Sequence, residues 1–353
     1  MKRTGGTFER IVSFENLIEA ARRAQRGKRF RRDVSEFNLN LERELVGLQY
    51  ELAGGTYRPG PYKTFAIRDP KPRLISAAPY RDRVVHHAIC AIIEPIFERS
   101  FIHDSYACRR GEGAHAAVAR LTHFMQGADY AMKLDVRRFF PSVDQGILME
   151  LVRRKLKCPR TLDLLGLVLA NGDGAQHEAD YLPGDDLLTP LERPRGLPIG
   201  NQTSQFLANV YLDPLDHYAK ETLGCSRYLR YADDIVILED DRATLAGIRR
   251  ALSDFALRRL RLRFHLSRAE AVPVHCGMTY LGYRVFPTHR RLVRANGVRF
   301  ARAMRRMQRM YAIGRINGEE VGKRIVGWIG HAAHADTYGL RTTLIEGVVF
   351  RRE

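Results

Sequence analysis

Residues 228–238 read Tyr228-Leu229-Arg230-Tyr231-Ala232-Asp233-Asp234-Ile235-Val236-Ile237-Leu238, with two adjacent acids between two short apolar runs. Asp tolerates turn conformations, and the β-branched residues after it favour a buried strand. The stretch therefore predicts a β-hairpin whose turn carries the acids. Like charges side by side repel each other unless a cation lies close to them, and a divalent metal ion is the usual cation.

A solvated turn is the alternative interpretation of an Asp-Asp pair, since charged side chains normally lie in water. A third carboxylate in a similar setting argues against it. Residues 130–134 form a strand-like run that ends at Asp135, far upstream of Asp233, so only the fold could bring the two acids together. Strand-borne acids of this kind predict a two-metal site. One ion activates an attacking hydroxyl there, and the other stabilises the leaving oxygen of an in-line phosphoryl displacement.

The composition predicts a polyanionic partner. The 353 residues include 58 Lys and Arg against 40 Asp and Glu, which gives a formal charge of +18, and 45% of the residues are hydrophobic. A chain of this length can bury a sizeable core, and its positive charge favours nucleic acid as the partner. A basic membrane-binding protein is the alternative, but no apolar run reaches the roughly 18 residues that a spanning helix needs.

The cysteines and the N-terminus bear on the compartment. Five cysteines are scattered without a Cys-x-x-Cys pair, which argues against a disulfide framework or a structural zinc site and fits a reducing compartment. The polar N-terminus has no signal-peptide core, so we expect a cytoplasmic protein. His331 and His334 have helical spacing, but the sequence places no cysteine or third histidine near them to complete a zinc site.

The first part of the chain predicts helices followed by a basic hairpin. Ser13 can cap an early helix, and a basic run from Gln25 to Arg32 follows it, either as a solvated helix face or as a contact with phosphates. The helical pattern stops at Gly54-Gly55. Residues 57–78 then form short β-like pieces that carry Lys71 and Arg73, residue types able to bind triphosphate oxygens. A generic basic hairpin is the alternative.

Three further segments stand out. Phe140 follows Asp135 by five positions, where it could lie against the sugar of a nucleotide and exclude a 2′-hydroxyl, with core packing as the alternative. Residues 196–205 read Gly-Leu-Pro-Ile-Gly-Asn-Gln-Thr-Ser-Gln, a turn that enters a helix and whose glycines allow close backbone approach. Residues 279–283 predict a turn at Leu281-Gly282 between short strands. The basic helical segment after Val298 carries Met304, Met307 and Met310, which we expect in a core.

The order of these segments resembles the successive fingers and palm motifs of reverse transcriptases. The resemblance covers roughly residues 60 to 285, and its most specific part is the Tyr-Ala-Asp-Asp box at 231–234. It implies an α+β right-hand polymerase fold with fingers, a ferredoxin-like palm and a short helical thumb. The expected division is a helical basic extension over 1–56, fingers and palm over 57–290 (fingers mainly 57–128 and 149–195), and a helical thumb over 291–353.

The same resemblance implies a role for each matching residue. Asp135, Asp233 and Asp234 would be catalytic and would hold two Mg²⁺ ions together with the backbone carbonyl of Val136. The expected dNTP pocket consists of Lys71, Arg73, Phe140, Ile199 and Gly200, and the expected primer grip consists of Leu281 and Gly282. The implied partners are template RNA, the cDNA or primer strand, and dNTPs, with no membrane.

Within the family, residues 199–205 are similar to the variant found in reverse transcriptases of diversity-generating retroelements, bacterial and phage enzymes related to those of group II introns. Most other reverse transcriptases have Gln where this chain has Ile199, and residues 327–337 also look like this subgroup. The subgroup implies error-prone copying at template adenines and a small basic accessory protein. The alternatives are a group II intron or retron reverse transcriptase, or an RNA-binding factor that has kept the fold without polymerising.

Overall fold

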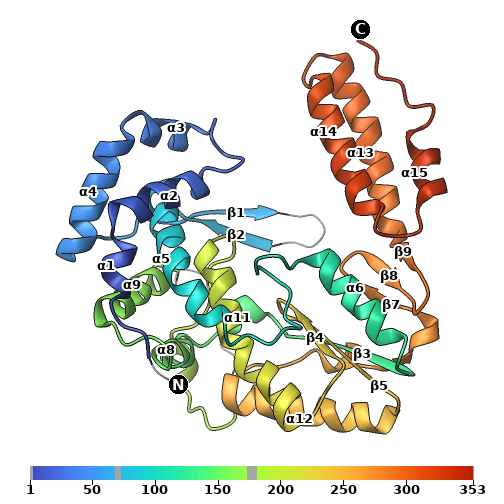
Figure 1. The fold of residues 1–353 in the computed structure, drawn as a ribbon, viewed down its shortest axis with the longest axis horizontal. Helices are drawn as coiled ribbons and strands as arrows, with labels where there is room; N and C mark the ends of the chain where they lie inside the picture. Colours follow the sequence, from blue (N-terminus) through green and yellow to red (C-terminus); the bar gives the residue numbers. More distant parts are fainter. Residues whose placement is uncertain (1–2, 68–72, 173–180, 353) are drawn as a thin grey trace.

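The computed structural model describes residues 3–67, 73–172 and 181–352. Within these ranges, helices surround three antiparallel sheets of two, four and three strands (Figure 1). Antiparallel sheets with helices packed on them define an α+β protein, as the sequence predicted.

The four-stranded sheet has the strand order β4-β5-β3-β6 and lies between α6 (Ala114–Met125) and α12 (Arg242–Leu260) (Figure 1). Its strands are β3 (Tyr130–Asp135), β4 (Tyr228–Tyr231), β5 (Asp234–Glu239) and β6 (Ala271–Pro273). Helix α11 (Gln202–His217) precedes β4, and α12 connects β5 to β6. This β-α-β-β-α-β connectivity, with the first and third strands in the middle, is ferredoxin-like and confirms the expected palm topology.

Both faces of this sheet are covered, which explains the unbroken apolar run in β5. Its residues Ile235 to Leu238 have no exposed surface. Ile235 and Ile237 belong to a large core shared with α11 and α12, whereas Val236 and Leu238 belong to a second core formed with α6. The alternation follows from the two-residue period of a strand, so each β5 side chain has a defined face.

Helices at the N-terminus extend the large core. They are α1 (Thr7–Ile11), α2 (Phe14–Ala24), α3 (Arg32–Leu39) and α4 (Leu41–Gly54), and α2 packs along α5 (Tyr80–Glu98). The Ser13 side chain accepts a hydrogen bond from the Asn16 backbone N–H, which confirms Ser13 as the N-cap of α2. Between α4 and α5, the hairpin of β1 (Lys63–Ile67) and β2 (Arg73–Ala77) extends away from the N-terminal helices (Figure 1).

The connection between β3 and α11 consists mainly of helices. They are α7 (Phe139–Ser142), α8 (Gln145–Arg153), α9 (Pro159–Ala170) and α10 (Thr189–Glu192). A π-helical turn (Tyr218–Thr222) continues α11, and short 3-10 helices at Leu266–Arg268 and Val274–Cys276 flank β6. Helices α8 and α9 pack on the α11 side of the molecule and join the large core, which fixes the start of α11 relative to β3.

The C-terminal part contains the three-stranded sheet and a separate group of helices. The sheet pairs β7 (Met278–Tyr280), β8 (Tyr283–Val285) and β9 (Arg290–Leu292), and the helices are α13 (Arg294–Ala312), α14 (Gly318–Ala332) and α15 (Tyr338–Ile345). These helices stand apart from the other helices in Figure 1 and have their own core. Met304 and Met307 are buried in that core, as predicted. Over the described ranges, none of the helices has the length and apolarity needed to cross a bilayer.

Candidate active site

The β4–β5 hairpin presents its two acids differently. Tyr231 pairs with Asp234, so the connection between the strands consists of Ala232 and Asp233. Ala232 has a φ angle of 53°, the positive value that such tight hairpin connections require and that a residue with a Cβ rarely adopts. Asp233 therefore lies in the turn, while Asp234 is the first residue of β5. The hairpin predicted from the sequence is confirmed, with one acid in the strand rather than in the turn.

Asp135 lies directly opposite Asp234 in the β3–β5 register. Residues opposite each other in an antiparallel pair project from the same face of the sheet, with Cβ atoms about 4.5–5.5 Å apart. The fold thus brings the third carboxylate next to the hairpin, as the two-metal hypothesis requires. Two like charges at this separation destabilise a sheet unless a cation compensates them.

Lys133 supplies such a cation. It precedes Asp135 by two positions on β3, so its side chain shares the face of the acids, and its Nζ lies 2.8 Å from Asp234 Oδ1. We did not single out Lys133 from the sequence, although the two-residue period of the strand places it beside Asp135.

Carboxylate oxygens are the ligands that Mg²⁺ prefers, so the acids fit the ion chemically. Over the described ranges, no three His, Cys, Asp or Glu side chains are arranged to hold a metal ion together. One carboxylate oxygen of Asp234 is occupied by its ion pair with Lys133.

The exit from β3 is fixed through its backbone. The Asp135 carbonyl accepts a hydrogen bond of 2.9 Å from the His265 N–H, and the Arg137 N–H donates one of 2.7 Å to the Arg263 carbonyl. Val136 is buried and forms an isolated bridge with Phe264. This anchoring holds the backbone beside Asp135 in place, while a metal contact of the Val136 carbonyl stays a prediction.

Phe140 lies in the short helix α7, next to the glycine-containing loop. Its carbonyl accepts a hydrogen bond of 2.8 Å from the Leu197 N–H, and its ring lies 5.3 Å from the ring of Phe139. Phe139 is buried, whereas Phe140 is only partly buried against the large core. The position is therefore compatible with both interpretations, since one part of the ring packs and another part is accessible to a ligand.

The Ile199-Gly200 turn is docked on strand β2. The Ser76 N–H donates a hydrogen bond of 2.9 Å to the Ile199 carbonyl, and the Asn201 side chain donates one of 3.0 Å to the Ser76 carbonyl. Gly200 has a φ angle of 117°, and a Cβ there would lie 2.9 Å from Cγ2 of Ile75. Only glycine therefore fits this close approach.

The other expected members of the nucleotide pocket are less well defined. Lys71 lies outside the described residues, and the structure describes the Arg73 backbone at the start of β2 but not its side chain. After the turn, the Gln202 side chain donates a hydrogen bond of 3.2 Å to Glu94 on α5.

The expected primer grip is a tight turn between β7 and β8, as predicted. Leu281 and Gly282 have φ angles of 46° and 91°, and they join the paired residues Tyr280 and Tyr283. The Gly282 carbonyl accepts hydrogen bonds of 3.1 Å from the Val293 N–H and from the Asn296 side chain. The turn is thus tied to the beginning of α13.

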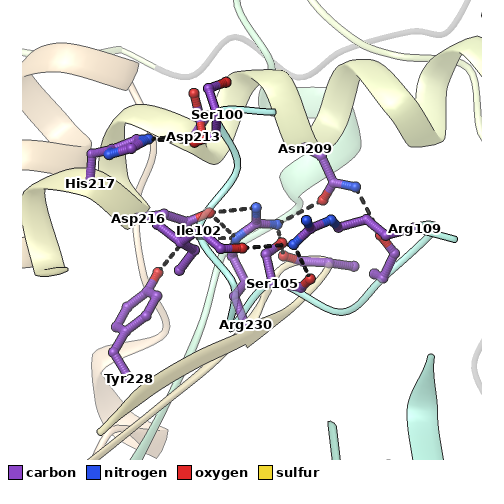
Figure 2. Close-up of polar contacts among 12 residues, drawn as sticks. Ser100, Ile102, Ser105, Arg109, Asn209, Asp213, Asp216, His217, Tyr228 and Arg230 are labelled. Atoms are coloured by element: carbon purple, nitrogen blue, oxygen red, sulfur yellow. Dashed lines mark hydrogen bonds and ion pairs between the residues drawn. The ribbon is translucent and has the colours of Figure 1, made fainter. Parts of the chain in front are cut away.

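A buried ion pair supports the acidic hairpin from the opposite face of the sheet (Figure 2). Arg230 and Asp216 on α11 have no exposed side-chain surface, and Nη2 of Arg230 lies 2.6 Å from Oδ2 of Asp216. The Tyr228 hydroxyl donates a hydrogen bond to Asp216, and Arg230 donates to the Asn209 side chain at 3.0 Å and to the Ala232 carbonyl at 2.9 Å. The guanidinium therefore holds the backbone of the turn that carries Asp233.

Burial alone would lower the pKa of Arg230, but the Asp216 carboxylate beside it reverses this and raises the pKa. Arg230 thus stays charged. The sequence contained one signal for this network, an arginine between apolar strand residues, since a buried cation needs a buried partner. The identity of that partner, Asp216 on α11, was not predictable, because no local sequence pattern links it to Arg230.

Three histidines meet where α14 contacts α6. The rings of His115 and His334 stack at 3.6 Å, and Nδ1 of His331 lies 2.9 Å from the hydroxyl of Tyr283, the residue that follows the Leu281-Gly282 turn. No third histidine lies near His331 and His334 along the chain, and the fold supplies His115 from a distant helix. Burial and the neighbouring histidines lower the pKa of His115 and of His331, and Arg290 also lowers that of His115.

The family to which the chain belongs follows from comparison with known proteins. The sequence model of the family "Reverse transcriptase (RNA-dependent DNA polymerase)" matches residues 67–285, which is more than half of the chain. The chain therefore belongs to the reverse transcriptases, the class of RNA-directed DNA polymerases, and the expected right-hand polymerase fold is confirmed.

Individual proteins share only a limited sequence identity with this chain. Protein YkfC of Escherichia coli (strain K12) is 26% identical over 69% of this chain and 71% of that protein. Group II intron-encoded protein LtrA of Lactococcus lactis subsp. cremoris is 25% identical over 50% of this chain and 28% of LtrA. Retron Mx162 reverse transcriptase of Myxococcus xanthus is 31% identical over 48% of this chain and 32% of that enzyme. The matched region thus spans less than a third of these last two proteins.

Among solved structures, apo telomerase from Candida tropicalis truncated from its C-terminal domain superposes with a TM-score of 0.46 and 12% identity. The superposition covers 70% of this chain and 59% of that chain. A second structure, of telomerase from Candida albicans with a fragment of telomeric RNA, has a TM-score of 0.43 and 10% identity. It covers 83% of this chain and 58% of that chain.

Replacing Arg230 by Met should destabilise the protein strongly, by about 3–5 kcal/mol, because the charge of Asp216 is then buried without its partner. The double variant R230M/D216L should recover much of this loss, since both charges are gone. Urea denaturation followed by circular dichroism measures both effects. Arg154→Met, which removes an exposed i,i+4 partner of Glu150, is the matched control. An R230M midpoint equal to that of R154M would contradict the buried network.

Docking of α14 on α6 should weaken as the pH falls. His115 and His331 have lowered pKa values in the docked state, so this contact is complete above the ordinary histidine pKa of about 6.5 and is lost as the pH falls toward the lowered values. The distribution of distances between spin labels on exposed positions of α6 and α14 should become broader when the pH is lowered from 7.5 to 5. The variant H115Q/H331Q/H334Q should show no such pH dependence. Equal broadening in that variant would assign the effect to other groups.

Proposed function

We propose that this chain copies an RNA template into cDNA as the error-prone reverse transcriptase of a diversity-generating retroelement. The observation that carries the subgroup is the Ile199-Gly200 turn, which packs against β2 in a loop whose Leu197 N–H donates a hydrogen bond to the Phe140 carbonyl. The family assignment supplies the reaction class. The residue at 199, an aliphatic side chain where most relatives have an amide, supplies the subgroup.

In this proposal, a primer 3′-hydroxyl attacks the α-phosphate of a dNTP and pyrophosphate leaves. Asp135 and Asp233 would hold two Mg²⁺ ions together with the Val136 carbonyl, and Asp234 would support them. The bound ions supply the charge that activates the hydroxyl and neutralises the leaving oxygen. The register that puts Asp135 opposite Asp234 supports this assignment, because it places two of the three acids on one face of the sheet, next to the turn that carries Asp233.

The remaining residues of the site bind the dNTP and the primer and select the sugar of the nucleotide. Lys71 and Arg73 contact the triphosphate, Phe140 excludes a 2′-hydroxyl, and the Leu281-Gly282 turn contacts the primer end. The ring of Phe140 is only partly buried, and its backbone carbonyl accepts a hydrogen bond from the Leu197 N–H; both observations support a role in sugar selection. The ties between Gly282 and α13 support a primer contact that is shared with the C-terminal helices.

The expected division of the chain belongs to the same proposal. Residues 1–56 form a basic extension, 57–290 the fingers and palm, and 291–353 a thumb. The separate core of α13–α15 supports a distinct thumb, whereas α1–α4 share the large core and support an extension built onto the fingers. Template RNA and the growing DNA are the proposed partners of the basic surfaces, together with a small basic accessory protein. A cytoplasmic location fits these partners.

Another bacterial reverse transcriptase is the second candidate, and the similarity to LtrA and to the Mx162 enzyme favours it. A group II intron or retron enzyme would share the acids and the polymerisation step but not the error spectrum at template adenines. A factor that only binds RNA would lack incorporation altogether. Sequencing of cDNA made by the purified complex of protein and RNA separates these three.

Replacing Asp233 by Asn should abolish dNTP incorporation on a primed RNA template. RNA affinity should change by less than about threefold, because basic surfaces provide the binding and the acids only the chemistry. Incorporation in Mg²⁺ and filter binding of the template-primer measure the two properties. Asp254→Asn, at an exposed acid on α12, is the matched control and should retain full activity. Persistent incorporation by the Asp233→Asn variant would refute the catalytic assignment.

Replacing Ile199 by Gln should lower misincorporation at template adenines. Ile199 brings no hydrogen-bonding group to the nascent base pair, so selection there depends more on shape, and an amide would add a polar contact that discriminates between bases. Deep sequencing of cDNA from a defined template gives the error spectrum. Ile199→Leu keeps an aliphatic side chain and should keep the parental spectrum. An unchanged spectrum in Ile199→Gln would count against the subgroup assignment.

A further inference from the structure

Lys133 and Asp234 form an ion pair inside the candidate metal site. The Nζ–Oδ1 distance is 2.8 Å, and the two side chains are 32% and 26% exposed. In the strand register, Asp234 lies opposite Asp135, and Lys133 lies on the same face two residues along β3. The ammonium thus pairs with Asp234 on the sheet face that also carries Asp135, where the charges of the two acids would otherwise repel each other.

The surroundings of Lys133 favour this position over a solvated one. Its Nζ lies 6.0 Å from the centre of the Tyr280 ring, a distance at which a cation is attracted to the face of an aromatic ring. Tyr280 is fully buried directly before the Leu281-Gly282 turn, and burial together with the charge of Asp234 raises the pKa of its hydroxyl. The buried, uncharged ring of Tyr280 thus limits the positions that the Lys133 side chain can adopt beside Asp234.

We propose that Lys133 is a positioning residue that serves as a built-in counter-ion for Asp234. It compensates the acids before metal ions bind, and it keeps Asp234 as a supporting acid rather than a full metal ligand. Asp135 and Asp233 are then left to bind the ions. The proposal rests on the proposed function, because it concerns the same metal site.

Electrostatics predicts how Lys133 changes the affinity of the site for divalent ions. A positive charge near a cation site lowers the affinity for the cation, and partial exposure to solvent reduces the effect without removing it. Without the positive charge of Lys133, the acidic site should attract divalent ions more strongly. Asp234 would then be free to turn toward the ions, and the arrangement needed for catalysis would be disturbed. Tighter metal binding should therefore accompany slower incorporation.

The test uses the full chain and Mn²⁺ as the probe, with free and bound Mn²⁺ quantified by electron paramagnetic resonance. Lys133→Met should bind Mn²⁺ about tenfold more tightly than the parent and incorporate dNTPs more slowly at saturating metal. Lys133→Arg, which keeps the charge, should bind Mn²⁺ like the parent. Lys323→Met removes the same charge from an exposed position on α14 and should change neither property.

A double-variant cycle tests whether Lys133 acts through Asp234. In the Asp234→Asn background, Lys133→Met should change Mn²⁺ affinity much less than in the parent. Lys133→Gln serves as a second neutral variant if Lys133→Met does not fold. Equal or weaker Mn²⁺ binding by the neutral variants, or no Mn²⁺ binding by the parent, would overturn the proposal. A parent that binds Mn²⁺ without incorporating dNTPs would overturn the proposed function instead, since the affinities still test Lys133.

Discussion

The guanidinium of Arg230 lies without exposed surface between α11 and the β4–β5 hairpin, where it binds Asp216 and the Ala232 carbonyl. A buried charge is tolerated only when a partner charge and hydrogen bonds replace water. One of these hydrogen bonds ends on the acidic turn itself. The turn therefore cannot shift without disturbing the ion pair. The backbone that carries Asp233 is thus held in place, although Asp233 lies in a connection of only two residues.

The two faces of the central sheet carry opposite charge arrangements. On the α11 face, the cation Arg230 comes from the hairpin and its acid from a helix. On the other face, the hairpin provides the acid Asp234, and Lys133 on β3 provides the cation. Strand alternation makes this possible, because neighbouring residues of one strand project to opposite sides. On each face, the negative charge thus has a positive partner close by. The acids at the strand ends therefore repel each other less, and the sheet tolerates them.

Distant segments hold each functional loop by its backbone. Strand β2 binds the Ile199 carbonyl, and the beginning of α13 binds the carbonyl of Gly282. Both turns contain a glycine with a positive φ angle and a close neighbour, so their shape depends on contacts made across the molecule. The regions proposed as fingers, palm and thumb are consequently linked at the two turns that border the acids.

The sequence by itself determined the local elements and the family. The acids at 233–234 predicted a hairpin, the run before Asp135 predicted a strand, and Leu281-Gly282 predicted a turn, because turn and strand preferences depend on neighbours in the chain. Only the tertiary structure decided which residues face each other. The pairing of Asp135 with Asp234, the ion pair of Lys133, and the partner of Arg230 depend on strand register and helix packing. A shift of one residue in register would move every side chain to the other face, and no local pattern specifies it.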